Sequence, residues 1–364
     1  MKNSQKGFVG ALLLVIIGVL VVGGGVYIYS QKKSPSTNTP TNQVSNNTQN
    51  TTATNDADLR ISYVPISASN NSAPAFNAVK KDSIAKADLD FLSKYFGSFS
   101  SKNLPPIAQS QKILTAHGDL LKIFDTNSNK PYRCSIAMGE SCFLQPVRNI
   151  ANLAALRAVI SYQQNKLSEA QTTASNIVAL GKNITANLDD TITLLIGWTA
   201  QKLGYNILSM VHPKGNSALF SDSEKSNLIA TLRGEQKKSL QYDYTRRMEM
   251  IDYITSPNNK PSIVVDADGE DTIKIYRDGI AASPTAWNPS ETKKYFYDSY
   301  KITLSNIDLP CGATPQKSML NLNFDPNNQQ TENFVGKTLY TTTYASLDTL
   351  STKRCEIENL IQNL

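Results

Sequence analysis

The feature that most constrains this chain is an apolar run of 22 residues, Phe8 to Tyr29, that holds no charged side chain. Two lysines precede the run and two follow it. At about 1.5 Å of rise per residue, a helix over the run reaches roughly 33 Å, enough to cross a hydrocarbon core of about 30 Å. A cleaved secretion signal usually has an apolar core of only about 7 to 15 residues. We therefore expect residues 1–33 to be a retained transmembrane anchor.

The start of the run also offers an alternative. Lys6-Gly7-Phe8 before an apolar helix resembles the leader of type IV pilins and pseudopilins, which are cut after the glycine. In that family a glutamate stands fifth in the mature chain and pairs with the terminal amine of a neighbouring subunit, whereas here the position holds Leu12. Pilin helices continue into the globular head, but this one meets the proline-containing residues 34–37, which end helices. The resemblance implies a filament or secretion subunit.

A polar segment follows the apolar run. Residues 34–58 contain one aliphatic side chain larger than alanine, Val44, and no aromatic one. Burial cannot offset the entropy of ordering such a segment, so we expect a disordered or extended linker over residues 34–79. Basic residues are balanced across the two flanks of the run, and the positive-inside rule therefore gives no orientation.

The four cysteines lie in two neighbourhoods, Cys134 with Cys142 and Cys311 with Cys355. Their even number fits an oxidising compartment outside the cytoplasm. Of the three possible pairings we prefer Cys134–Cys142, which share a loop, and Cys311–Cys355, which would join the last helix to the loop before it. The chain has no C-x-x-C motif and its two histidines lie far from the cysteines in sequence, so disulfides are favoured over a zinc site. We expect a single-pass protein of the cell membrane with its main domain outside the cytoplasm.

Charge excludes one class of partner. The formal net charge is +6, but without the four lysines that flank the apolar run the chain has 32 basic and 30 acidic residues. A nucleic-acid-binding domain needs a basic stripe of its own. We therefore expect no nucleic-acid partner, while the oligomeric state is not readable from the sequence.

Helical periodicity begins near residue 80 and predicts a mainly α domain over residues 80–256. The expected helices cover 82–98, 106–124, a segment around Leu153–Ile160, a segment from a capping box at Ser168, 191–211, and a segment from a capping box at Ser221 to about Tyr253. Residues 191–211 are apolar nearly all round, but Gln201 and Lys202 interrupt them, which favours a helix buried among others over a second membrane span.

The region 153–211 resembles helical hairpins of the tetratricopeptide type. Ala158 and Tyr162 stand in its first helix, and Ala170 and Ala174 in its second. The expected glycine and proline positions and a fixed repeat period are missing. The chain also resembles single-pass bacterial surface proteins with helical ectodomains. These resemblances imply an architecture and transfer no function.

Residues 257–364 are expected to form a smaller, mostly helical part that packs on the first domain. Two β-favouring runs within Ile263–Ile280 surround an acidic turn and predict a small β-hairpin. Asn288, Pro289 and Glu291 fit the N-cap, N1 and N3 positions of a helix, and a closing helix is expected over 340–362.

Candidates for chemistry are few. The carboxylate cluster Asp266–Asp271 departs from the spacing of a calcium-binding EF-hand loop, which favours a solvated turn. The acidic residues of the long segment include Glu235, Asp243 and Glu249, which two-carboxylate glycoside hydrolysis would need. However, Asp243 with Arg247, and Arg246 with Glu249, have the spacing of ordinary helix ion pairs. His117 belongs to no catalytic motif.

These observations predict a membrane-anchored extracytoplasmic helical protein with a structural or protein-interaction role. We expect no catalytic residues, no cofactor and no metal, and a protein or cell-envelope component as partner. The alternatives are a hydrolase of envelope glycans and a pilin-like subunit.

Overall fold

The computed structural model describes residues 56–61, 70–80, 82–133, 144–186, 191–212, 218–256, 258, 267–314, 316–317, 322, 332–344 and 347–364. Within these ranges the chain is mainly helical and contains no β-strand, which confirms the expected α class. The helices are α2 (Ala73–Asn77), α3 (Lys86–Phe96), α4 (Ile107–Ala116), α5 (Gly118–Asn127), α6 (Leu144–Gln163), α7 (Leu167–Ala186), α8 (Thr191–Val211), α9 (Asp222–Thr255), α10 (Ala267–Ala282), α11 (Pro289–Ser305), α12 (Phe334–Tyr344) and α13 (Leu347–Gln362), with a 3₁₀ turn η2 at Pro284–Ala286.

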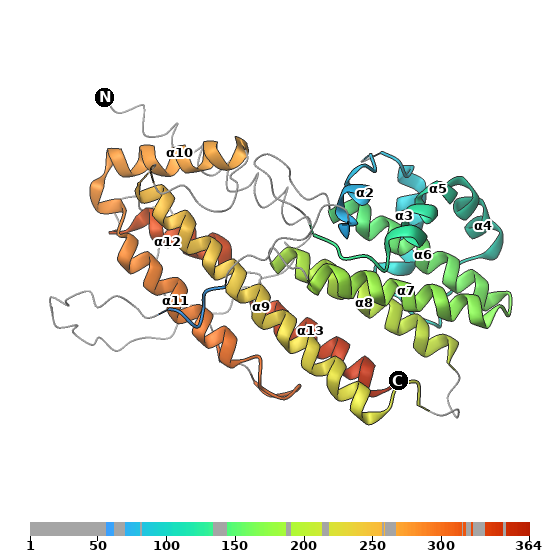
Figure 1. Ribbon diagram of the computed structural model, residues 1–364. Helices are drawn as coiled ribbons and strands as arrows, with labels where there is room; N and C mark the ends of the chain where they lie inside the picture. The colour runs from blue at the N-terminus through green and yellow to red at the C-terminus, as the bar shows by residue number, and fades with distance from the viewer. Residues whose placement is uncertain are drawn as a thin grey trace, which may run out of the picture.

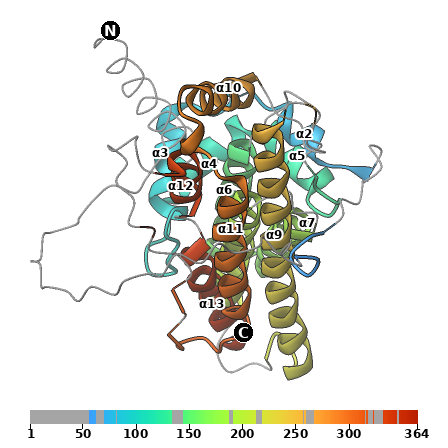
Figure 2. The ribbon, with the colours of Figure 1, turned by 90° about the vertical axis from the view of Figure 1, so that its left-hand side faces the viewer.

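Helices α2 to α8 occupy one end of the molecule and α9 to α12 the other, while α13 lies against both α8 and α9 (Figure 1). Figure 2 shows α9 and α11 running side by side. The end of the chain returns to the start of α9, where the backbone N–H of Leu219 donates to the carbonyl of Leu364 at 2.8 Å. The last helix therefore connects the two groups of helices.

Helices α7 and α8 touch backbone to backbone. A Cβ atom added to Gly181 would lie 2.5 Å from the carbonyl oxygen of Gly197, and one added to Gly204 would lie 2.8 Å from that of Ala174. Small residues of α7 thus allow the backbone of α8 to approach closely. Helix α7 begins at Leu167, so Ser168 lies inside its first turn and is not an N-cap, contrary to the predicted capping box.

Helix α8 is buried as expected. Trp198 and Ile207 are each at most 1% exposed, although their spacing along the helix places them on opposite sides of its axis. Among the helices that the structure describes, none combines the length and apolarity needed to span a bilayer. The predicted anchor, residues 1–33, lies outside the described residues.

The segment predicted as one helix over 106–124 is two helices. His117 leaves helical geometry with φ −113° and ψ 27°, and its Nε2 lies 2.9 Å from Oδ2 of Asp88 in α3. This contact with another helix holds the break between α4 and α5. The closing helix predicted over 340–362 overlaps the end of α12 and the whole of α13.

The predicted β-hairpin within Ile263–Ile280 is wrong, because residues 267–282 form helix α10. Ile273 is 1% exposed and packs with Tyr276 and Ile280 against the last turns of α9. These three side chains recur at helical spacing, i, i+3 and i+7, and so lie on one face of a helix. Packing against α9 therefore stabilises a helix here, although the same residues have a high β propensity.

The linker expected over 34–79 ends earlier than predicted. Leu59 and Phe76 are fully buried, and α2 lies within that range. The backbone N–H of Ser72 donates to the carbonyl of Pro131 at 2.8 Å, and the ring of Phe76 lies 6.0 Å from that of Tyr132. Buried apolar side chains and backbone hydrogen bonds therefore attach parts of this segment to the helical body.

Candidate functional site

The best candidate for a binding site is a cavity of about 270 Å³ beside the N-terminal end of α6. One wall comes from the end of α2 and the segment that leads to α3, and the other from the first turns of α6. Its lining residues are Asn77, Ala78, Val79, Lys80, Ser83, Ile84, Gln145, Pro146, Asn149 and Ile150. Small-molecule sites generally begin near 300 Å³, so the cavity suits a single large side chain or a small group.

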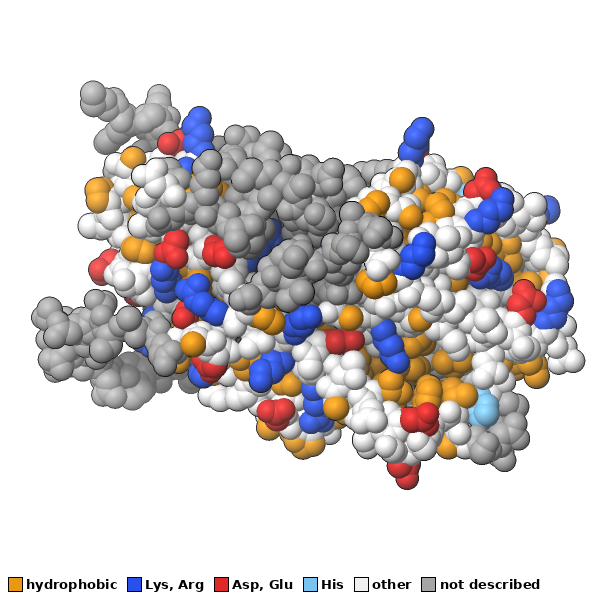
Figure 3. All heavy atoms as spheres, viewed as in Figure 1, with side chains coloured by type: hydrophobic (Ala, Val, Ile, Leu, Met, Phe, Trp, Pro, Cys, Tyr) orange, Lys and Arg blue, Asp and Glu red, His pale blue; other side chains and the backbone are white. Residues whose placement is uncertain are grey.

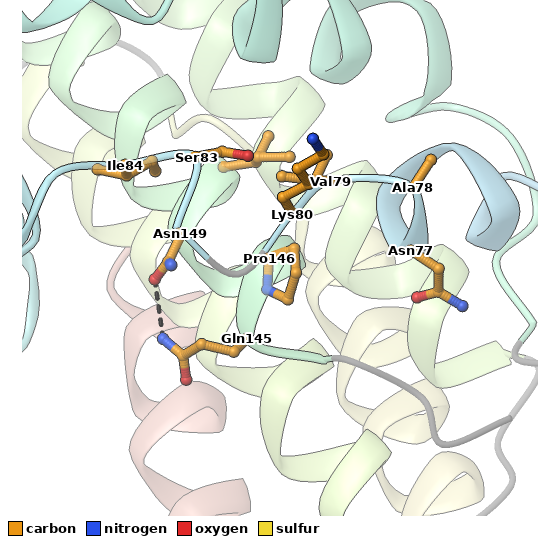
Figure 4. A pocket seen from close by; sticks show the side chains of 10 residues that line it. Asn77, Ala78, Val79, Lys80, Ser83, Ile84, Gln145, Pro146 and Asn149 are labelled. Carbon is orange, nitrogen blue, oxygen red and sulfur yellow. Dashed lines mark hydrogen bonds between the residues drawn. The ribbon is translucent and has the colours of Figure 1, made fainter.

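The walls of the cavity are mostly apolar, with amides beside them. Pro146 lies at the centre in Figure 4, between Asn77 on one side and the amide pair of Gln145 and Asn149 on the other. Gln145 Nε2 donates to Asn149 Oδ1 at 2.8 Å, a bond of the i, i+4 type within α6. Because the cavity combines apolar contact area with fixed amide groups, it can bind a ligand in one orientation.

A first buried polar network surrounds Glu235 of α9. Its carboxylate accepts hydrogen bonds from Thr185 of α7 and from Trp198 Nε1 of α8, the latter at 2.9 Å. Gln201 Nε2 lies 3.1 Å from the Thr185 hydroxyl. Burial raises the pKa of Glu235, while these hydrogen bonds and the charge of Lys182 oppose the rise. Glu235 does not line the cavity beside α6.

A second network joins α9 to α11. Arg247 NH2 lies 3.1 Å from Asp243 Oδ1, which confirms the predicted i, i+4 ion pair. Tyr300 of α11 donates its hydroxyl proton to Asp243 and accepts a hydrogen bond from Arg247 Nε at 3.0 Å. Burial, followed by the charge of Asp243, raises the pKa of Tyr300 well above its ordinary value. The carboxylate of Asp243 is therefore held by contacts that join α9 to α11.

A third network lies beside the disulfide of Cys311 and Cys355, whose Cα atoms are 5.5 Å apart. This pairing is the one predicted from sequence. Glu358, 3% exposed, accepts a hydrogen bond from Arg233 Nε at 3.1 Å and forms an ion pair with Arg354, whose Nε lies 3.0 Å from its Oε1. Burial lowers the pKa of Arg354, and the charge of Glu358 opposes that shift. The spacing of Arg354 and Glu358, four residues apart on a helix, was a signal for this pair that the sequence analysis did not use.

Of the remaining residues that the sequence analysis singled out, the structure describes some and not others. The predicted pair Cys134–Cys142 lies outside the described residues. Within Asp266–Asp271, helix α10 already begins at Ala267, so the expected turn is wrong there, and the acidic side chains are not described. The pairing of Arg246 with Glu249 stays a prediction. His117 binds Asp88 and is 8% exposed.

Surface charge on the face shown in Figure 3 is mixed, with basic and acidic side chains interspersed. This agrees with the near balance of charges after the apolar run and its flanks. Comparisons with family models, with curated proteins and with solved structures find no match to this chain.

Proposed function

We propose that this chain is a membrane-tethered protein whose helical body lies outside the cytoplasm and binds a protein or another component of the cell envelope. The observation that carries the binding role is the cavity between α2 and α6, which offers apolar walls and amides without a convergent set of titratable groups. Its volume of about 270 Å³ suits one large side chain of a partner.

Two features of the chain support the location. The uncharged run Phe8 to Tyr29 has the length of a membrane span. The Cys311–Cys355 bridge fits a compartment in which disulfides persist. The polar segment between the apolar run and Leu59 gives the helical body reach from the membrane surface.

A site-specific photocrosslinker tests the binding role in intact cells. Placed at Ala78, which is exposed and lines the cavity, it should yield a discrete crosslinked species in the membrane fraction. The matched control is Ala108, an exposed alanine of α4 outside the cavity lining, where no such species is expected. Adding Ala78→Trp to a chain that carries the crosslinker at Ser83 should abolish the product, because the indole fills the cavity. Equal products from Ala78 and Ala108 would reject the cavity as the contact site.

A hydrolase of envelope glycans is the alternative that one observation favours, since burial raises the pKa of Glu235 as in a general acid. Both oxygens of that carboxylate, however, are engaged by Thr185 and Trp198, and the residue is 7% exposed. We expect the purified chain to release no soluble fragments from peptidoglycan. Release that Glu235→Gln abolishes in a folded variant would establish the enzyme instead.

A further inference from the structure

The disulfide between Cys311 and Cys355 lies between opposite charges. Glu358 Oε2 is 3.2 Å from Sγ of Cys311, and Arg354 NH2 is 3.9 Å from Sγ of Cys355. Both cysteines are partly exposed, whereas Arg354 and Glu358 are 1% and 3% exposed. The two sulfurs therefore have unequal electrostatic surroundings, in residues that are both partly exposed to solvent.

The same atoms also form a candidate metal site, since Cys311, Cys355 and Glu358 offer ligand atoms within 4.8 Å of one another. However, Glu358 Oε1 faces Arg233 Nε at 3.1 Å and Arg354 Nε at 3.0 Å, and its Oε2 lies 3.3 Å from Arg233 NH2. Two guanidinium groups therefore already contact the carboxylate, and a divalent cation there would meet two fixed positive charges. This arrangement favours sulfur chemistry over metal binding.

The loop that carries Cys311 is held in place without the disulfide. Arg354 donates to the backbone carbonyls of Ile307 and Leu309, the latter at 3.3 Å. Asn306 Nδ2 donates to the carbonyl of Gln316 at 2.8 Å, and the backbone N–H of Gln316 returns a bond to Asn306 Oδ1 at 3.0 Å. The two sulfurs should therefore stay opposite each other when the bond between them opens.

We propose that this disulfide is a site of directional thiol–disulfide exchange with a small-molecule thiol. The incoming thiolate forms a bond to Sγ of Cys311, the Cys311–Cys355 bond breaks, and its electron pair leaves on Cys355 as a thiolate beside Arg354. One disulfide replaces another and one thiolate replaces another, so atoms, electrons and charge balance. The thiolate of Cys355 then either attacks Cys311 and expels the small thiol, or remains while a second thiol removes the first from Cys311.

The direction follows from where charge develops. Exchange is faster when the leaving sulfur better tolerates negative charge. A leaving Cys355 gains its charge beside a guanidinium, which favours a thiolate. A leaving Cys311 would gain the same charge 3.2 Å from a carboxylate oxygen, which opposes it. Once reduced, Cys311 can instead donate its S–H proton to Glu358.

The test uses the detergent-solubilised full chain and 2-mercaptoethanol. Brief exposure followed by excess N-ethylmaleimide should leave the mercaptoethanol adduct on Cys311 and the maleimide on Cys355, in roughly tenfold excess over the reverse pattern. Peptide mapping by mass spectrometry separates these products from those of Cys134 and Cys142. This measurement needs no variant, and it is independent of the proposed tether and partner.

Variants then test the role of the guanidinium. Arg354→Gln should slow exchange about tenfold, and Arg354→Lys should restore most of the rate. Lys353→Gln removes the same charge one residue away, from an exposed lysine that pairs with Glu356, and should leave the rate within about twofold. Adducts divided equally between the cysteines, adducts mainly on Cys355, or exchange only at the rate of global unfolding would overturn the proposal.

Discussion

Contacts from two other helices surround the carboxylate of Glu235 in α9. Thr185 of α7 and Trp198 of α8 both donate to it. Hydrogen bonds to a charged group contribute about 1.5–3 kcal/mol, and leaving such a group unsatisfied in the interior costs at least as much. At the residue scale, this one side chain fixes how α7, α8 and α9 meet.

Glu235 should also make stability depend on pH. Burial raises its pKa above the ordinary value of 4.5, so the folded chain holds the proton more tightly than the unfolded chain does. The contribution of Glu235 to the free energy of unfolding therefore falls as pH rises from 4.5 through the folded pKa. The Glu235→Gln side chain has no proton to lose. The difference in the free energy of unfolding between this variant and wild type should therefore change by about 1.4 kcal/mol per pH unit in that window.

Denaturant unfolding at a series of pH values measures this difference. Glu332→Gln, a change of the same charge at an exposed position, is the control and should follow the wild type. If Glu235→Gln and wild type have parallel pH profiles, the carboxylate does not titrate as the burial predicts.

At the scale of elements, the most extensive contact among the described helices is between α7 and α8, where glycines replace side chains at the helix interface. A Cβ atom on Gly197 would lie 2.5 Å from Thr185 Cγ2 and 2.9 Å from the carbonyl oxygen of Gly181. Neither helix can accept that atom without moving apart. The separation of the two helices is thus set by the absence of side chains.

Gly197→Ala should therefore destabilise the protein by about 1–3 kcal/mol, as overpacking of a core does. The matched control is Gly234→Ala in α9, where an added Cβ atom meets nothing within 4 Å. There the better helix propensity of alanine should stabilise by up to about 1 kcal/mol. Opposite shifts of Tm in the two variants would support the interface, whereas equal shifts would show that α7 and α8 can move apart freely.

At the scale of the whole molecule, α13 and the disulfide connect parts of the chain that are distant in sequence. The bridge joins residues 44 apart, from the loop after α11 to α13, which itself packs on α8 and α9. A cross-link of this span restricts the unfolded chain by roughly 4 kcal/mol in the loop-entropy description. The C-terminal helices should therefore depend on it more than the α6–α8 group does.

Replacing both Cys311 and Cys355 with alanine should lower the free energy of unfolding by about 2–4 kcal/mol. Calorimetry of the double variant against wild type measures the loss. Wild type in reducing buffer should lose at least as much free energy of unfolding as the double variant, because reduction also opens the Cys311–Cys355 bridge. An unchanged Tm for both samples would mean that the bridge adds no constraint.

The N-terminus of the mature chain tests the tether at the same scale. Sequencing of membrane-extracted protein should begin at or next to Met1 if the apolar run is a retained anchor. Protease added outside cells should then release a soluble helical body by cutting within residues 34–55. A mature terminus at Phe8 would indicate the pilin-like processing, and a terminus beyond Tyr29 would indicate a cleaved secretion signal.

Local sequence predicted those features whose cause is local. The capping box at Ser221 and Glu224 is present, Asn288 caps α11 through the backbone N–H of Glu291, and Asp243 pairs with Arg247. Each depends on residues three or four positions apart, whose geometry a helix fixes. The helical class and the Cys311–Cys355 pair were predictable for related reasons, from periodicity and from cysteine spacing.

Only the tertiary structure decided where the β-favouring residues around Ile273 belong and which groups meet around Glu235. In α10, packing of Ile273 against α9 outweighs the strand propensity of its neighbours. The cavity between Val79 and Pro146 likewise joins residues more than sixty positions apart. The sequence by itself determined the helical class, most helical segments before α10 and the candidate membrane span, because these follow from periodicity and composition. Long-range burial decided the rest, since its energy depends on neighbours that no local pattern specifies.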